Sequence, residues 1–376
     1  MLAEAQVAGE QLRRLGVEAV IDADIHNELP SLKTLYPYLA AHWVDYCEES
    51  AFTGPDANDY PKGAPVTARP DSRPADGRPP GSDLELLRNQ VLDPWQVRWG
   101  ILNCAYRVQS VHNPDLAAAL ATAINQWQID AWLEPEARLR ASLVVPSQIP
   151  ELAAAEIERF GGHPGFVQVA LPVRSLIPYG NRIYDPLYAA AVKHDLVVGI
   201  QYGGAPGLPP TPAGWPSTYI EEYAGMAQVF QSQVISLIIE GVFDRFPTLR
   251  VALLESGFTW MPSLMWRIDK EWKGLRHNTP WVKRPPSDYM REHIRLTVQP
   301  LDAPPDLRQL AEIVEQMESD EMLMFASDYP HQHDDRHTNP VADVLPLLEP
   351  PSLVQKVMFE NAATLYRLPG NAGMAS

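Results

Sequence analysis

The chain has 376 residues and a formal net charge of −17, and 45% of its residues are hydrophobic. That length is enough for one large α/β barrel or two ordinary domains. The acidic balance disfavours nucleic acid and anionic membrane surfaces as partners, and no apolar run is long enough to predict a membrane-spanning helix.

Short apolar runs alternate with stretches of helical spacing through most of the sequence. In chain order, strands are predicted over 19–22, 101–104, 141–146, 166–172, 196–202, 250–255, 294–299 and 322–328, and helices over 113–133, 149–161, 186–195 and 306–317. Alternating strands and helices form parallel sheets. Eight such strands favour a (β/α)8 TIM barrel over an open sheet, so we expect one domain over residues 1–376.

Residues 51–83 interrupt this alternation with many prolines and almost no apolar periodicity. We expect a long, extended Pro-rich insertion on the surface, poor in secondary structure. Loops of this length are usually disordered or functional, and one use is to wrap a neighbouring subunit, for which Phe52 and Tyr60 offer anchors.

The first predicted strand ends in the stretch "VIDADIH", which places Asp24 and His26 two residues apart. Side chains two apart project to the same side of a strand, and barrel active sites lie where the strands end. A carboxylate and an imidazole that converge there need a compensating partner, and a divalent metal supplies one. The alternative is a loop-capping aspartate beside an ordinary loop histidine.

Polar groups follow three further apolar runs. Asp328 ends "MLMFASD" and is followed by His331, Glu255 ends "RVALLE", and Gln201 and Tyr202 end "LVVGIQY". Together these favour a site at one rim of the barrel. His333 and His337 follow in "HQHDDRH" and indicate either a second metal site or a solvated polar loop.

Several segments resemble the amidohydrolase superfamily, in the branch of the aminocarboxymuconate semialdehyde and γ-resorcylate decarboxylases. They include "VIDADIH", "GVFDRFPTLRVALLESG", "REHIRLTVQPLD", "FASDYPH" and "FENAATLYRL", and run from about residue 20 to residue 368. The resemblance implies a barrel with a metal at its mouth.

Carried over residue by residue, the resemblance gives Asp24, His26 and Asp328 as metal ligands, while Gln201 and Glu255 stand where the family has histidines. Glu255 is a further candidate ligand, Asp328 and His331 are the candidate catalytic residues, and Gln201 and Tyr202 the candidate substrate-binding residues. We expect a divalent metal: zinc, iron or manganese. Because oxygen ligands predominate among the candidate ligands, they favour manganese or iron over zinc. A barrel that has lost its metal is the alternative.

The first functional hypothesis is therefore hydrolysis or non-oxidative decarboxylation of a small carboxylate-bearing molecule at a mononuclear metal site. The second is the reduced-site subunit of a heteromeric non-haem iron monooxygenase similar to α-aminoisobutyrate hydroxylase, in which the insertion clamps a related barrel. The third is a binding barrel without chemistry. We expect a homo- or hetero-oligomer with a related barrel subunit. Because the chain has only two cysteines, we expect no disulfide framework and a location in the reducing cytoplasm.

Overall fold

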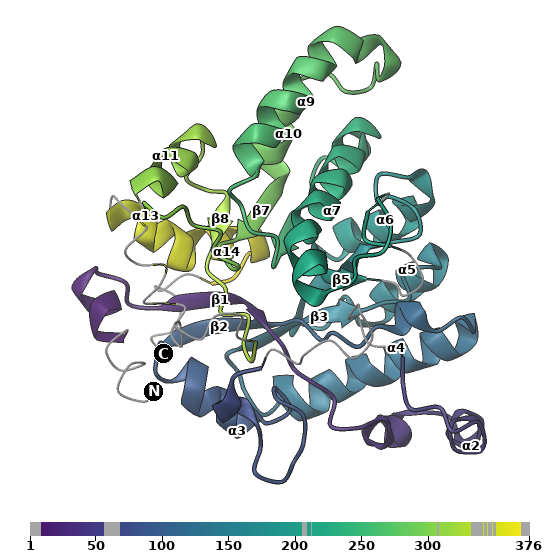
Figure 1. The fold of residues 1–376 in the computed structure, drawn as a ribbon. Coiled ribbons are helices and arrows are strands. Elements are labelled where there is room, and N and C mark those ends of the chain that lie inside the picture. Colours follow the sequence, from purple (N-terminus) through teal and green to yellow (C-terminus); the bar gives the residue numbers. More distant parts are fainter. Residues whose placement is uncertain are drawn as a thin grey trace.

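A computed structural model describes residues 9–55, 68–204, 209–211, 213–306, 308–331, 341, 344, 348 and 351–369. Its centre is one sheet of eight parallel strands in the order of the chain (Figure 1). The strands are β1 Val20–Ile25, β2 Val97–Leu102, β3 Leu139–Val144, β4 Phe166–Arg174, β5 Val197–Gly204, β6 Val251–Leu254, β7 Ile294–Thr297 and β8 Leu323–Met324. All eight predicted strands are present, and the predicted TIM barrel is confirmed.

The last strand meets the first through hydrogen bonds of the segment that follows β8. The backbone N–H of Ala23 donates to the carbonyl of Phe325 at 3.0 Å, and that of His26 donates to the carbonyl of Tyr329 at 2.7 Å. An isolated parallel bridge joins Ile25 and Tyr329. These bonds connect the end of β1 directly to the loop that carries the predicted site residues.

Helices surround the strands (Figure 1). The α-helices are α2 Ala41–Glu49, α3 Leu84–Leu87, α4 Pro114–Gln128, α5 Pro150–Phe160, α6 Asp185–Lys193, α7 Tyr219–Ile239, α8 Val242–Arg245, α9 Met261–Leu275, α10 Pro286–His293, α11 Arg308–Gln316, α13 Pro351–Gln355 and α14 Asn361–Tyr366. The side chain of Asn113 caps α4 by accepting from the N–H groups of Asp115 and Leu116. None of the helices in the described ranges is long and apolar enough to cross a membrane.

Alternate residues of the strands enter two separate apolar clusters. In β6, Val251 and Leu253 belong to the larger cluster, which also takes in most buried helix residues. Ala252 and Leu254 belong to a smaller one, with residues of β1, β2, β5, β8 and α14. This two-residue periodicity separates the barrel interior from the layer between strands and helices.

The described end of the insertion lies on the rim of its own barrel. Ala68 forms an antiparallel bridge with His331, the N–H of Arg69 donates to the carbonyl of Pro330 at 2.8 Å, and Gly81 accepts from the N–H of Glu28 at 3.0 Å. Residues 56–67, with the proposed anchor Tyr60, lie outside the described residues. Residues 68–83 thus brace the loop after β8.

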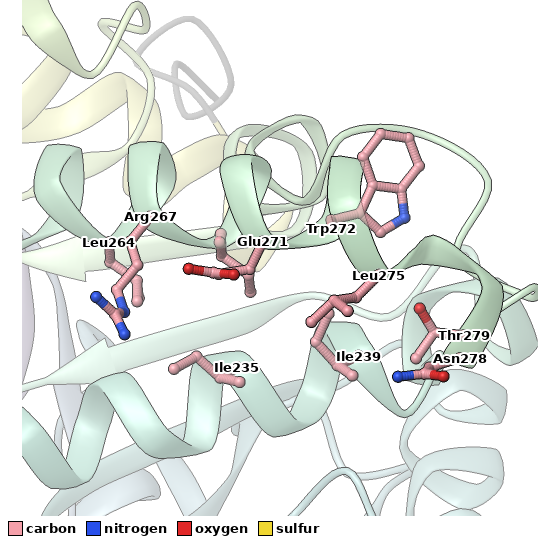
Figure 2. Close-up of a pocket in the computed structure, with 10 residues that line it drawn as sticks. Ile235, Ile239, Leu264, Arg267, Glu271, Trp272, Leu275, Asn278 and Thr279 are labelled. Carbon is pink, nitrogen blue, oxygen red and sulfur yellow. The ribbon is translucent and has the colours of Figure 1, made fainter.

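Helices α9 and α10 project beyond the other helices (Figure 1). A cavity of about 260 Å³ lies between α7 and α9 (Figure 2). Most of its lining is apolar. The polar side chains are those of Arg267, Glu271, Asn278 and Thr279, and the apolar ones are those of Ile235, Ile239, Leu264, Ile268, Trp272 and Leu275.

Candidate metal centre

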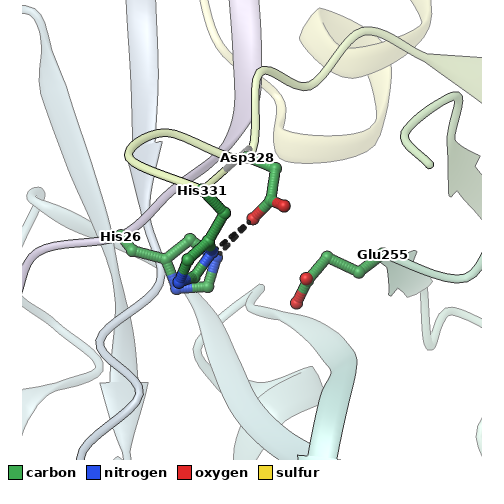
Figure 3. A group of neighbouring side chains, drawn as sticks. All are labelled: His26, Glu255, Asp328 and His331. Carbon is green, nitrogen blue, oxygen red and sulfur yellow. Dashed lines mark hydrogen bonds and ion pairs between the residues drawn. The ribbon is translucent and has the colours of Figure 1, made fainter. Parts of the chain in front are cut away.

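Four predicted site residues meet at the ends of three strands (Figure 3). His26 follows β1, Glu255 follows β6, and Asp328 and His331 follow β8. Each offers one ligand atom, and these atoms all lie within 4.8 Å of one another. The group therefore lies at the carboxyl end of the strands, where (β/α)8 enzymes carry their active sites.

Asp328 is the hub of this group. Its Oδ1 lies 2.9 Å from Nε2 of His26 and 2.9 Å from Nδ1 of His331, and the two imidazole ring centroids are 4.4 Å apart. The side chains of Asp328 and His26 are buried, whereas that of His331 is 27% exposed. One carboxylate oxygen thus connects a deep imidazole to one that reaches solvent.

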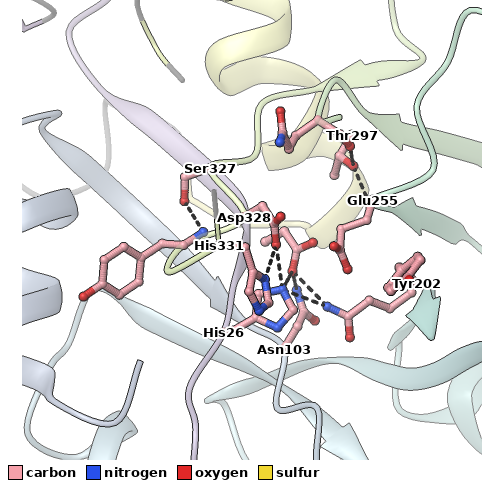
Figure 4. A network of polar contacts seen from close by, with 12 residues as sticks. His26, Asn103, Tyr202, Glu255, Thr297, Ser327, Asp328 and His331 are labelled. Carbon is pink, nitrogen blue, oxygen red and sulfur yellow. Dashed lines mark hydrogen bonds and ion pairs between the residues drawn. The ribbon is translucent and has the colours of Figure 1, made fainter. Parts of the chain in front are cut away.

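Glu255 and Asp328 both adopt backbone angles that are uncommon for residues with a side chain, with φ of 55° and 56°. Such residues persist where the surrounding structure holds them, often at functional sites. The N–H of Glu255 donates to Oγ1 of Thr297 at 3.1 Å, and the N–H of Asp328 donates to the carbonyl of Asp24 at 3.0 Å. Both carboxylates are thereby aimed at the barrel mouth (Figure 4).

Asp24, a predicted metal ligand, is not one of these four residues but lies beside His26. Its Oδ1 is 3.6 Å from Nε2 of His26 and accepts hydrogen bonds from Nδ2 of Asn103 at 2.8 Å and Nε2 of Gln201 at 3.2 Å. Its Oδ2 is buried and has no hydrogen-bond partner among the described residues. One carboxylate oxygen of Asp24 is therefore fixed by hydrogen bonds, and the other is buried without one in the described part of the chain.

The protonation of the buried groups is shifted. Burial raises the pKa of Asp24 to about 7, with a further contribution from the charge of Asp328 and opposition from His26 and Asn103. Burial also raises the pKa of Asp22 to about 7. Burial lowers the pKa of His331, but the charge and hydrogen bond of Asp328, with smaller effects of other carboxylates, outweigh it and raise that pKa to about 9.

These groups fit a divalent cation. Two imidazoles and two carboxylates within 4.8 Å form a donor set that zinc, manganese and iron all accept. Oδ2 of Asp24 and Oε1 of Gln201 are buried oxygens without a partner in the described part of the chain. Buried carboxylates are costly unless they are paired or coordinate a metal, so a cation is the partner that this arrangement needs.

The two predicted substrate-binding residues differ in their surroundings. Nε2 of Gln201 lies 3.2 Å from Asp24 and 3.3 Å from Nε2 of His26, so this residue is part of the metal-side cluster. The ring of Tyr202 lies 5.2 Å from that of Tyr223, and its carbonyl accepts from Arg107 at 2.8 Å. His333 and His337 lie outside the described residues.

Asn103 and Tyr223 are site residues that the sequence analysis missed. Asn103 is the polar residue of the run "ILNC" and follows β2 directly, so the rule applied to the other strand ends would have found it. Tyr223 lies on α7 with its ring 5.2 Å from that of Tyr202, and its pKa is raised by burial and then by the charges of Glu255 and Asp328. No pattern in the sequence marks it.

Comparison with known proteins supplies the family. A family model described as Amidohydrolase matches residues 21–368. The γ-resorcylate decarboxylase of Rhodococcus jostii (strain RHA1) is 25% identical over 312 residues, which are 76% of this chain and 88% of that protein.

Solved structures share the fold. An amidohydrolase from Mycobacterium avium subsp. paratuberculosis K-10 superposes with a TM-score of 0.70 at 19% identity, over 93% of this chain and 99% of that one. A dihydroxybenzoic acid decarboxylase from Polaromonas sp. JS666, with bound manganese and the inhibitor 2-nitroresorcinol, has a TM-score of 0.66 at 21% identity, over 95% and 99%. None of these relatives is an oxygenase, so they lend the monooxygenase alternative no support. The motifs and the family match agree, and the chain belongs to the amidohydrolase family of enzymes.

Proposed function

We propose that this protein is a metal-dependent decarboxylase that releases carbon dioxide, without oxidation, from a small aromatic carboxylate. The observation that carries the proposal is the group of His26, Glu255, Asp328 and His331 at the barrel mouth. The reaction class is supported by the named activity of the γ-resorcylate decarboxylase relative.

The cation would be held by His26, Asp328 and Glu255, with Asp24 and Gln201 beside them. We propose manganese, because carboxylate and amide oxygens outnumber nitrogens in this set and because the Polaromonas structure is described with bound manganese. When bound, such an ion polarises substrate oxygens and offsets their negative charge. Zinc and iron remain the alternatives to be tested.

Asp328 and His331 would handle the proton. Decarboxylation replaces the carbon–carbon bond to the carboxylate with a carbon–hydrogen bond, so one proton must reach the ring carbon as carbon dioxide leaves. The 2.9 Å bond between Asp328 and the partly exposed His331 provides a path from solvent to a buried carboxyl group. A positioned acid of this kind contributes about 10²–10⁴-fold to a rate.

The tyrosines near the site support an aromatic substrate. The rings of Tyr202 and Tyr223 lie 5.2 Å apart at an angle of 56°, and burial together with the charges of Glu255 and Asp328 raises the pKa of Tyr223. Aromatic side chains favour stacked or edge-on contacts with a planar ligand. We assign Tyr202 to substrate binding on this ground, and Gln201 on the separate ground that its buried Oε1 has no hydrogen-bond partner among the described residues.

The proposal is tested with purified protein, reloaded with Mn²⁺, Zn²⁺ or Fe²⁺ and incubated with hydroxybenzoates that carry a carboxylate beside a hydroxyl group. We expect loss of the acid, stoichiometric carbon dioxide, no oxygen consumption, and the highest rate with Mn²⁺. Amide or ester hydrolysis without carbon dioxide release would point to the hydrolase reading. Oxygen consumption that requires a second protein would contradict the proposal.

We also propose that two copies associate through the groove between α7 and α9. Ile235 and Leu275, which line the groove, are 39% and 57% exposed. In a pair related by a two-fold axis, Arg267 of one copy would face Glu271 of the other. Light scattering should give a dimer for the wild type and a monomer for Leu275→Glu. A monomeric wild type would contradict the assignment.

For the compartment we propose the cytoplasm. Cys47 and Cys104, the two cysteines of the chain, are both free and buried. Free thiols are usual in reducing compartments. Localisation of a tagged full-length chain tests this directly.

A further inference from the structure

A row of buried polar side chains crosses the barrel interior below Asp24. Nδ2 of Asn103 donates to Oδ1 of Asp24 at 2.8 Å, and Oδ1 of Asn103 accepts from Nε2 of Gln168 at 2.8 Å. Oε1 of Gln168 accepts from the hydroxyl of Tyr366 at 2.9 Å. The row thus runs from α14, at the far end of the barrel, to the site.

The orientation of each amide is determined by its neighbours. Nδ2 of Asn103 also donates to the carbonyl of Ala23 at 3.1 Å, so both groups that it faces are acceptors. Oδ1 of Asn103 is also 2.5 Å from the hydroxyl of Ser142, which donates to it. Burial raises the pKa of the Tyr366 hydroxyl above its ordinary value, so this group keeps its proton and donates to Gln168.

The barrel makes room for this row at a cost in packing. A Cβ on Gly199 would lie 2.3 Å from Cδ of Gln168, so glycine is needed at this position of β5. Small barrels are ordinarily filled by branched aliphatic side chains, and buried amides are costly unless every bond is made. Packing alone does not explain a row of fully hydrogen-bonded side chains that ends on a carboxylate of the site, so we looked for a functional explanation.

We propose that Tyr366, Gln168 and Asn103 are positioning residues that fix Asp24 toward the metal. With Oδ1 held by Asn103 and Gln201, the carboxylate cannot rotate freely, and Oδ2 stays directed away from the amides. The inference rests on the proposed metal site. It adds that residues at the opposite end of the barrel set the affinity of that site, since partners of metal ligands commonly tune binding.

Two variants separate orientation from packing. Tyr366→Phe removes the donor at the start of the row and so loosens the orientation of Gln168, Asn103 and Asp24. It should weaken Mn²⁺ binding about fivefold, less than the loss of a direct partner of a ligand. Gln168→Glu keeps the shape and the bond from Tyr366 but turns an oxygen toward Oδ1 of Asn103, which favours rotation of that amide. It should weaken binding about 10–100-fold.

Tyr188→Phe is the matched control. Tyr188 is also buried, and its hydroxyl donates to the carbonyl of Tyr179 at 2.6 Å, on α6 outside the barrel interior. The melting temperature of Tyr188→Phe should fall about as much as that of Tyr366→Phe, whereas its Mn²⁺ affinity should stay within about twofold of wild type.

The affinities are measured by calorimetric titration of metal-free protein with Mn²⁺, and the visible spectrum of Co²⁺-loaded protein reports the ligand geometry. We expect Tyr366→Phe and Gln168→Glu, but not Tyr188→Phe, to change both. Wild-type affinity in Tyr366→Phe and in folded Gln168→Glu overturns the inference, as does an equal loss in Tyr188→Phe. A wild type that binds no Mn²⁺ overturns the proposed function, and this inference with it.

Discussion

The two ends of the barrel use acidic residues in opposite ways. Before β3, Glu136 is bound by Arg138 and Arg88, each at 2.9 Å, and before β5, Asp195 is bound by Arg250 and Arg367 at 2.7 and 2.8 Å. Near the carboxyl end of β1, Asp24 has no lysine or arginine within ion-pair distance in the described ranges, and its ionisable neighbours include His26 and Asp328.

The difference distinguishes stability from function. Acids at the amino ends of the strands are matched by arginines and need nothing more. Acids at the carboxyl ends are more deeply buried, and one oxygen of Asp24 has no hydrogen-bond partner among the described residues. Proteins tolerate such an arrangement where a ligand completes it. Substitutions at the carboxyl ends of the strands should therefore change activity and metal binding, and substitutions at the amino ends should change stability.

Asp328→Ala should have the largest effect. It removes the carboxylate that holds His26 and His331, so catalysis should fall by about 10³-fold or more. Arg138→Ala, at the opposite end, should lower the melting temperature and leave the rate unchanged. Steady-state rates and melting curves of both variants provide the comparison, and near-normal turnover in Asp328→Ala would contradict it.

Gln201→His introduces an imidazole at the position where the resemblance to the family implies a histidine ligand. Because imidazole suits zinc better than an amide oxygen does, we expect the ratio of Zn²⁺ to Mn²⁺ affinity to rise about tenfold. Competitive metal titration measures the ratio. An unchanged ratio would place Gln201 outside the metal's reach.

Asp24→Asn should raise the melting temperature of the metal-free protein by about 2 °C, because it removes a buried charge next to Asp328. The same variant should gain less than wild type from added Mn²⁺. Calorimetry with chelator and with Mn²⁺ gives both numbers. A lower melting temperature in chelator would show that this carboxylate is stabilising without a cation.

Glu136→Gln should have the smallest effect, about 1 °C at pH 7. Hydrogen bonds from Arg138, and then from Arg88, lower the pKa of Glu136 to about 2, against burial. Because the folded pKa lies below the unfolded one, this stabilisation is present above about pH 5 and is lost as the pH falls toward 2. The difference in melting temperature should therefore shrink in acid, and a constant difference would exclude the charge as its cause.

The barrel was predictable because each strand is a short apolar run followed by polar residues. The same pattern gave Asp24, His26, Glu255 and Asp328, since the ends of parallel strands must meet at one rim. His331 was identified by its position after Asp328 within "SDYPH".

Other features depend on packing between distant segments. The rotation of Asp328 and Glu255 into the site requires positive φ angles, which are held by the backbone of Asp24 and the hydroxyl of Thr297. The contact of Tyr223 with Tyr202 joins α7 to the end of β5, and no local pattern in the sequence marks it. The return of residues 68–83 to the loop after β8 is made by backbone hydrogen bonds, which leave no trace in composition.

The most direct test of the central claim is anomalous diffraction from crystals of the wild-type protein grown with Mn²⁺. The account predicts one strong manganese peak within coordination distance of His26 and Asp328, at the carboxyl ends of β1 and β8. Full-length, correctly folded protein with no peak at this rim, or with those side chains turned away from it, would contradict the account.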